Sequence, residues 1–317
     1  MYYIGVDLGG TNIAVGITDE SGKILVKGKV PTGKERHGDE IVADMGALCA
    51  SLVKEAGLTF DDIAYAGVAA PGSVDPANGE IKYANNINMF HYPLAKKLME
   101  HIPVKKVYLE NDANAAALAE AKAGAGKGYQ DVIMITLGTG VGGGIVIGGK
   151  LYSGFNYAGA ELGHVVIEYN GRPCTCGRKG CWETYSSATA LIAMTKEKMA
   201  ETKDTVMWEM CENGAKKVSG RTAFKAAKMG DKAGLEVVEK YIDYLACGIT
   251  NMVNIFQPEV LCIGGGVCGE GDYLLDPLKK IVDRDQYGSA AHDDKTVLKI
   301  AELGNDAGII GAALLGV

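Results

Sequence analysis

The chain has 317 residues, of which 47% are hydrophobic and 22% are charged, and its formal net charge at pH 7 is −7. A nucleic-acid-binding protein is expected to carry a basic face, which this acidic composition does not provide. The apolar runs fall far short of the ~20 residues needed to cross a bilayer. We therefore expect a cytoplasmic protein with no nucleic-acid or membrane partner, and with enough chain for two domains.

The first half of the chain is predicted to alternate strands with helices. Apolar residues at Ile41, Met45, Leu48 and Leu52 share one face of a helix. Glycines and Asx residues punctuate the other segments. The predicted strands cover 2–6, 13–17, 23–29, 63–69 and 105–109, and the predicted helices cover 39–56, 93–101 and 113–123.

The second half repeats the opening order of strand, glycine turn and strand. Strands are predicted over 131–136, 145–147 and 260–263, a glycine turn over 137–144, and helices over 232–256, 273–282 and 307–315. This order predicts an α/β protein with two similar lobes facing each other across a cleft. We assign the first lobe to 1–118, with the last helix (304–317) packing back onto it, and the second lobe to 119–303.

The glycines gather in turns that suit phosphate binding. Glycine allows close backbone approach, and successive N–H groups in a tight turn bind anions. The pattern at Gly138-x-Gly140-x-x-Gly143 is followed by a strand, so it is not a dinucleotide fingerprint, which needs a helix there. One such turn alone is equally typical of a plain hairpin. The candidate phosphate-binding residues are Gly9, Gly10, Thr11, Asn12, Gly138, Thr139, Gly140, Gly264, Gly265 and Gly266.

Two aspartates end predicted strands. Asp7 stands beside the first glycine turn and could hold Mg²⁺ through water, or could simply cap the turn. Asp112 follows Asn111 at a strand-to-helix junction, where such residues often act only as helix caps. An ionised Asp112 could instead accept a proton from a hydroxyl that attacks phosphorus. Asn85, Asn86, Glu161, His164 and Glu183 are suited to join it and bind sugar hydroxyls.

Four residues in one segment suit a metal ion. His164 is followed by Cys174, Cys176 and Cys181, three of the eight cysteines of the chain. Three thiolates and one imidazole form a closed tetrahedral set typical of structural zinc, although free cytosolic thiols are the alternative. Zinc would use one nitrogen of His164 and leave the other as an oriented N–H donor.

These motifs together resemble the ROK family of repressors and sugar kinases, and within it the glucokinases. The resemblance rests on the segments 7–12, 110–114, 137–144, 161–164 and 174–183. It implies an actin-like, two-lobed kinase that transfers the γ-phosphoryl group of ATP to the 6-hydroxyl of a hexose, most simply glucose. Mg²⁺ and structural Zn²⁺ are the implied metals, and a homo-oligomer is the implied assembly.

The resemblance also implies roles for single residues. Asp112 would be the catalytic base, and the glycine turns with Asp7 would hold ATP and its metal. The sugar ligands would be Asn86, Asn111, Asp112, Glu161, His164 and Glu183, with Asn85 as an alternative to Asn86. Kinases for other sugars (N-acetylmannosamine, N-acetylglucosamine, fructose or allose) use the same residues. A sugar-binding sensor without catalysis is a further alternative, and a repressor would need a DNA-binding segment ahead of the first glycine turn.

Overall fold

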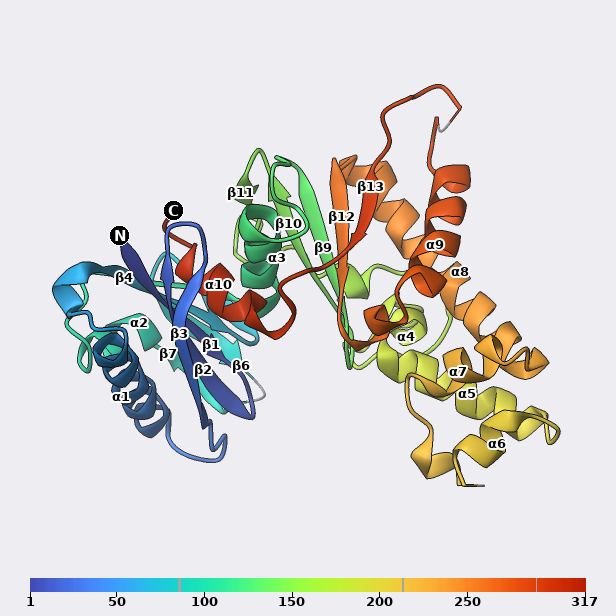
Figure 1. Cartoon of the computed structure of the whole chain (residues 1–317), viewed down its shortest axis with the longest axis horizontal. Coiled ribbons are helices and arrows are strands. Elements are labelled where there is room, and N and C mark those ends of the chain that lie inside the picture. Colours follow the sequence, from blue (N-terminus) through green and yellow to red (C-terminus); the bar gives the residue numbers. More distant parts are fainter. Residues whose placement is uncertain (85–86, 213, 289) are drawn as a thin grey trace. The chain divides into compact units, whose positions relative to one another are not determined.

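The computed structural model describes residues 1–84, 87–212, 214–288 and 290–317. The chain folds into two compact units that interleave along the sequence (Figure 1). Unit 1 comprises Met1–Met134, Gly144–Ala160 and Ala301–Val317, and unit 2 comprises Ile135–Gly143 and Glu161–Ile300. The lobe boundary between residues 118 and 119 stays a prediction. Among the described residues, no helix is long and apolar enough to span a membrane.

Unit 1 contains a five-stranded sheet with strand order β3-β2-β1-β4-β8. Its strands are β1 (Tyr2–Leu8), β2 (Asn12–Asp19), β3 (Ile24–Pro31), β4 (Ile63–Ala70) and β8 (Val107–Asn111). A small antiparallel sheet adds β5 (Ser73–Asp75), β6 (Glu80–Ala84) and β7 (Met89–Tyr92). The helices are α1 (Gly38–Glu55), α2 (Leu94–Met99), α3 (Asp112–Ala123) and α10 (Ala307–Ala313). The elements predicted for this half are therefore confirmed to within a few residues.

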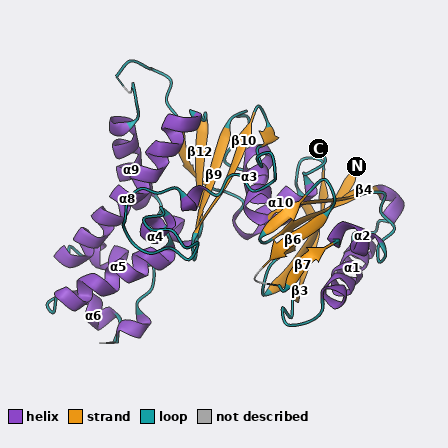
Figure 2. Ribbon diagram, turned by 180° about the vertical axis from the view of Figure 1, so that it is seen from behind, coloured by secondary structure: helices purple, strands orange, loops and turns teal. Residues whose placement is uncertain are grey.

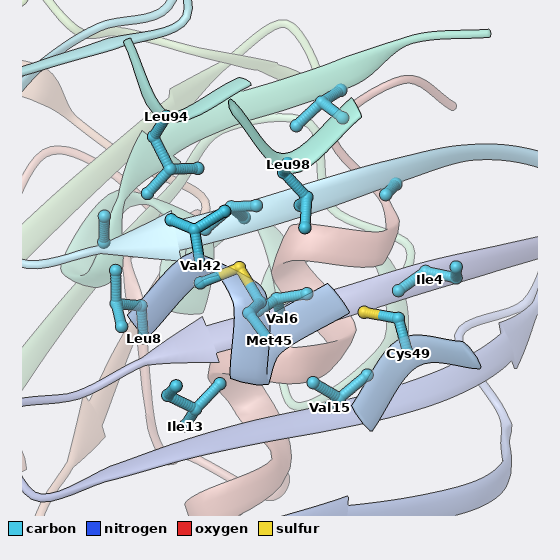
Figure 3. Packing of buried hydrophobic residues seen from close by; sticks show 14 of the residues in the cluster. Ile4, Val6, Leu8, Ile13, Val15, Val42, Met45, Cys49, Leu94 and Leu98 are labelled. Atoms are coloured by element: carbon cyan, nitrogen blue, oxygen red, sulfur yellow. The ribbon is translucent and has the colours of Figure 1, made fainter. Parts of the chain in front are cut away.

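The alternation of side chains along β1 explains how its two faces are used. Ile4, Val6 and Leu8 are fully buried and join the hydrophobic cluster that includes Val42 and Met45 of α1 (Figure 3). The intervening residues face the other side of the sheet, since successive side chains of a strand point in opposite directions. On that side, Gly5 leaves room for α10, because a Cβ at Gly5 would lie 2.0 Å from the carbonyl oxygen of Ile309.

Unit 2 carries most of the remaining helices (Figure 2). They are α4 (Glu183–Ser186), α5 (Ala188–Glu201), α6 (Val206–Met210), α7 (Thr222–Lys228), α8 (Lys232–Phe256) and α9 (Asp272–Asp285). The second five-stranded sheet has the order β11-β10-β9-β12-β13. Its strands are β9 (Val132–Leu137), β10 (Val141–Ile147), β11 (Lys150–Leu151), β12 (Val260–Gly264) and β13 (Val297–Ile300). The α/β fold class predicted from the sequence is confirmed.

The second glycine turn is shorter than predicted. We expected it to continue to residue 144, but β10 already begins at Val141. Gly143 and Gly144 both lie within this strand. Glycine is required at the two positions because neighbouring atoms occupy the space that a side chain would take. A Cβ at Gly143 would lie 2.6 Å from Leu162 Cγ, and one at Gly144 would lie 2.4 Å from the Cβ of Ala117. The turn itself is therefore Gly138-Thr139-Gly140, closed by a hydrogen bond of 3.0 Å from Gly138 N–H to the Gly140 carbonyl.

Candidate active site

Asp112 is the first residue of α3 and follows the helix cap Asn111. The Asn111 side chain accepts hydrogen bonds from the N–H groups of Ala113 (2.9 Å) and Asn114 (3.2 Å). It also donates to the carbonyl of Gly72 at 3.0 Å. Asn111 thus has the structural role of a helix cap, and its predicted contact with a sugar stays a prediction.

The carboxylate of Asp112 accepts a hydrogen bond of 2.8 Å from the N–H of Ala113. We expected the start of the helix to keep this group readily ionised. Burial has the larger effect and raises the pKa of Asp112, against the lowering effect of its hydrogen bonds. A carboxylate with a raised pKa is a better proton acceptor than an ordinary surface aspartate, which suits a general base.

Asp7 lies close enough to Asp112 for the two carboxylates to interact. Burial and then the charge of Asp112 raise the pKa of Asp7 to about 6. Gly308 of α10 packs directly against the Asp7 side chain, because a Cβ at Gly308 would lie 2.6 Å from the Asp7 Oδ2. Among the described residues, no ion pair joins Asp7 or Asp112 to a basic side chain. Two adjacent carboxylates without a protein cation suit a divalent cation, which prefers oxygen ligands.

A buried glutamate that we did not predict organises the same end of the sheet. Glu110 is 6% exposed. Its Oε1 accepts hydrogen bonds from Asn111 N–H at 2.9 Å and from the Asn114 side chain at 3.0 Å, and Ser153 donates to its Oε2 at 3.3 Å. Glu110 therefore sets the direction in which the strand passes into α3. Its position at a strand end, directly before Asn111 and Asp112, was the signal in the sequence. We assigned functional roles only to those two residues.

The first glycine turn, between β1 and β2, is held by a bond within the turn and by Thr32, which follows β3. Gly9 N–H donates to the carbonyl of Asn12 at 3.0 Å. Thr32, which is fully buried, donates its hydroxyl to the Gly9 carbonyl at 2.6 Å and its N–H to the Thr11 carbonyl at 2.9 Å. Thr32 follows β3, the next strand in the meander, so this support is local.

The second and third glycine turns lie together in unit 2. Gly265, between β12 and a short 3-10 helix at Gly266–Glu270, has φ of 99°. A Cβ there would lie 2.3 Å from the Leu137 carbonyl oxygen, immediately before the second turn. Gly138 and Gly266 face open space and have no positive φ. Packing within the protein therefore does not require glycine at these two positions. A ligand that approaches the backbone closely would require it.

The predicted metal ligands converge. The ligand atoms of His164, Cys174, Cys176 and Cys181 all lie within 4.8 Å of one another. Cys176 Sγ and Cys181 Sγ are 3.6 Å apart, and Cys174 Sγ is 3.6 Å from His164 Nδ1. A tetrahedral site with Zn–S bonds of about 2.3 Å has S–S edges of roughly 3.8 Å. The donor set and its spacing therefore fit zinc, with Nδ1 of His164 as the ligand atom.

Glu183 lies between this cluster and the second glycine turn. Its Oε1 is 3.0 Å from Cys174 Sγ and 3.7 Å from His164 Nδ1. Its Oε2 occupies the position next to Gly140, where a Cβ would lie only 2.4 Å away. Glu161 is exposed and precedes the 3-10 helix Leu162–His164. Asn85 and Asn86, the candidate sugar ligands after β6, lie outside the described residues.

The model of the ROK family matches residues 3–316 of this chain. The chain belongs to the ROK family. It is 38% identical over 312 residues to a glucokinase of Thermotoga maritima, covering 98% of this chain and 95% of that protein. The recognition made from the sequence motifs is therefore confirmed.

Solved structures of ROK proteins share the fold. A ROK family glucokinase from Streptomyces griseus, crystallised with glucose and AMPPNP, superposes with a TM-score of 0.80 at 36% identity, covering 99% of this chain and 98% of that one. A ROK hexokinase from Thermus thermophilus gives a TM-score of 0.80 at 32% identity, covering 99% and 97%. The predicted actin-like, two-lobed sugar kinase fold is thus confirmed.

Proposed function

We propose that this ROK protein is an ATP-dependent glucokinase that transfers the γ-phosphoryl group of ATP to the 6-hydroxyl of glucose. The observation that carries the chemistry is the pair Asp112 and Asp7, an exposed and a half-buried carboxylate, both with raised pKa and without an ion-pair partner in the described part of the chain. The similarity to the Thermotoga and Streptomyces glucokinases supports ATP and glucose as the substrates.

Asp112 acts as the general base. It accepts the proton of the sugar 6-hydroxyl while that oxygen forms its bond to the γ-phosphorus and the bond from phosphorus to the β,γ-bridging oxygen of ATP breaks. ADP and the sugar phosphate leave, and Asp112 then releases the proton to solvent. The raised pKa favours uptake of the proton at the moment of transfer.

Asp7 is suited to hold the magnesium that accompanies ATP, through coordinated water or directly. Bound Mg²⁺ would neutralise charge on the β- and γ-phosphates. The backbone N–H groups of the turns at 9–12, 138–140 and 264–266 would bind the phosphate oxygens, because glycine allows close approach. The open space beside Gly138 and Gly266 supports this role.

The proposed sugar contacts come from polar groups near these elements. With Nδ1 of His164 directed at the cysteines, Nε2 remains as an oriented donor for a sugar hydroxyl. Glu161 and Glu183 would accept from other hydroxyls, together with Asn86 and Asn111. Structural zinc would hold His164 and Glu183 in place.

A panel of hexoses tests the proposal. ADP release with Mg·ATP is measured for glucose, mannose, fructose, allose and the N-acetylhexosamines, and ³¹P and ¹³C NMR identify the phosphorylated hydroxyl. We expect turnover on glucose with phosphate at position 6. Turnover confined to another sugar would keep the mechanism and reject glucose. No turnover on any sugar would reject the kinase and favour a sugar-binding sensor.

We also propose a homo-oligomer, which light scattering would test.

A further inference from the structure

Two segments of unit 2 that both carry candidate zinc ligands contact the second glycine turn or the strand β10 that follows it. The histidine segment is Leu162–His164, and the cysteine segment runs from Cys181 to Ala188. The histidine segment ends at His164 and the cysteine segment begins at Cys181, and both residues belong to the cluster of candidate zinc ligands. A metal ion would therefore join the two segments.

The histidine segment contacts the strand that leaves the turn. Gly163 lies against the backbone of Val141, because a Cβ at Gly163 would be 2.1 Å from the Val141 carbonyl oxygen. The Leu162 side chain fills the space beside Gly143. Gly163 has no positive φ, so the requirement for glycine comes from this close contact. The position of the segment thus determines where β10 begins.

The cysteine segment contacts both ends of the turn itself. Ala188 N–H donates a hydrogen bond of 2.9 Å to the Gly138 carbonyl. At the other end, Glu183 places Oε2 against Gly140, while its Oε1 lies beside Cys174 and His164. One carboxylate therefore accepts a hydrogen bond from the Cys174 thiol at Oε1 and contacts the glycine turn with Oε2, so metal binding, which deprotonates that thiol, would act directly on Glu183.

We propose that the zinc cluster positions the second glycine turn for ATP, through Gly163 on one side and Glu183 on the other. This inference rests on the proposed function, in which the turn binds phosphate. Zinc would then affect nucleotide affinity even in the absence of sugar, although none of its four ligands belongs to the turn. Gly163 and Glu183 are the positioning residues in this account.

We expect the loss of zinc to weaken nucleotide binding only in part. Trp182 N–H donates to the Val165 carbonyl at 2.8 Å, and Val166 pairs with Cys181 in a β-bridge. These backbone contacts join the two segments without metal, so a chain that lacks zinc retains a loosened version of the arrangement. Because coupling between two binding sites typically changes affinity by about 5- to 150-fold, we expect the Kd of Mg·AMPPNP to rise by an amount near the lower end, about tenfold.

The first experiment removes the metal. Cys176→Ser replaces an exposed ligand, and Cys247→Ser, an exposed cysteine in α8 outside the cluster, is the matched control. Zinc content is measured by mass spectrometry, folding by circular dichroism, and the Kd of Mg·AMPPNP by calorimetry without sugar. We expect zinc to be lost and the Kd to rise about tenfold in Cys176→Ser alone, with recovery in wild-type protein that is stripped by a chelator and reloaded with zinc.

The second experiment keeps the metal and disturbs the contact. Gly163→Ala introduces a Cβ against Val141, whereas Gly220→Ala adds one in open space within the same unit. We expect Gly163→Ala to retain zinc, to melt below the control because the added Cβ displaces backbone, and to raise the Kd of Mg·AMPPNP about tenfold, with little further rise when Cys176→Ser is added.

Four outcomes separate the inference from the proposed function. A folded, zinc-free Cys176→Ser that binds Mg·AMPPNP as tightly as wild type overturns the inference. If that variant does not fold, an unchanged Kd in Gly163→Ala overturns it instead. Wild-type protein that binds the nucleotide but phosphorylates no hexose rejects the proposed function while the inference stands, and wild type that binds no nucleotide rejects both.

Discussion

The two glycine turns have similar sequences but different supports. Leu8-Gly9-Gly10-Thr11 is held by Thr32, whose hydroxyl bonds to the Gly9 carbonyl 23 residues away. Leu137-Gly138-Thr139-Gly140 is held by Ala188 and by Glu183, which also contacts the cluster of zinc ligands. The first turn depends on a bond within the turn and on Thr32 after β3, and the second depends on a segment that follows the metal ligands.

This difference shows that a repeated motif does not imply repeated support. A hairpin turn whose supporting threonine follows the next strand forms as soon as the meander folds. A turn whose supports come from later segments depends on the state of those segments, which here carry the four candidate metal ligands. The following predictions, ordered by expected effect, test whether the two turns respond independently.

The largest effect is expected from Asp112→Asn, which changes neither turn. The amide cannot accept the hydroxyl proton, so we expect kcat to fall by roughly 10²- to 10⁴-fold. The Kd of Mg·AMPPNP should change far less than kcat, because Asp112 belongs to neither phosphate-binding turn and Asp7 remains to hold the cation. Stopped-time ADP assays and calorimetry check both values. A variant that retains most of its kcat would exclude Asp112 as the base.

We expect the pH dependence of kcat/KM for ATP to arise from Asp7, which stands beside the first glycine turn. The pKa of Asp7 is about 6. Above this pH Asp7 is ionised and can hold a cation; as the pH falls through 6 it takes up a proton, and kcat/KM for ATP should decrease by up to about tenfold per pH unit. Gly163→Ala should lower the whole profile without moving this acid limb.

Asp7→Asn provides the control for that profile. We expect weak binding of Mg·AMPPNP with no dependence on pH between 5 and 7.5, measured by calorimetry. The variant should also be more stable than wild type at neutral pH, because an ionised carboxylate with a raised pKa destabilises the folded state. The stability difference in urea unfolding should shrink as the pH falls below 6. A persistent acid limb in Asp7→Asn would assign the limb to another group.

The smallest effect is expected from Thr32→Val, which removes the hydroxyl that supports the first turn. Loss of one such hydrogen bond should cost about 1 kcal/mol of stability and raise the KM for ATP a few-fold. Because this support does not involve the metal cluster, its effect should add to that of Cys176→Ser. Strong coupling between the two variants in a double-mutant cycle would mean that the turns are not independent.

Local patterns in the sequence predicted most of the fold. The periodicity from Ile41 to Leu52 gave α1, and the apolar alternation gave β1 and β2, because each signal lies within the element itself. The convergence of His164 with the three cysteines was also predictable, since all four lie within one short segment. The predicted start of β10 was wrong because Gly143 and Gly144 lie within the strand. Their glycine character accommodates Leu162 and Ala117, which sequence spacing does not reveal.

The supports of the site could not be predicted, because their partners are distant in sequence. Gly308 packs on Asp7 from the other end of the chain. Thr32 acts through a hydrogen bond to Gly9, 23 residues away, that leaves no motif of its own. The contact of Gly163 with Val141 at the start of β10, and that of Glu183 with the second turn, likewise depend on tertiary packing. The identities of the proposed reacting groups were therefore visible in the sequence, and the means of positioning them were not.

Hydrogen-exchange mass spectrometry on zinc-loaded and zinc-free protein tests the central distinction most directly, in the absence of nucleotide and sugar. Peptides that cover residues 138–143 and 9–12 are compared in the same sample. The account predicts that zinc removal speeds exchange at 138–143 and leaves 9–12 unchanged. Equal exchange at 138–143 in the two states, or an equal increase in both turns, would contradict it.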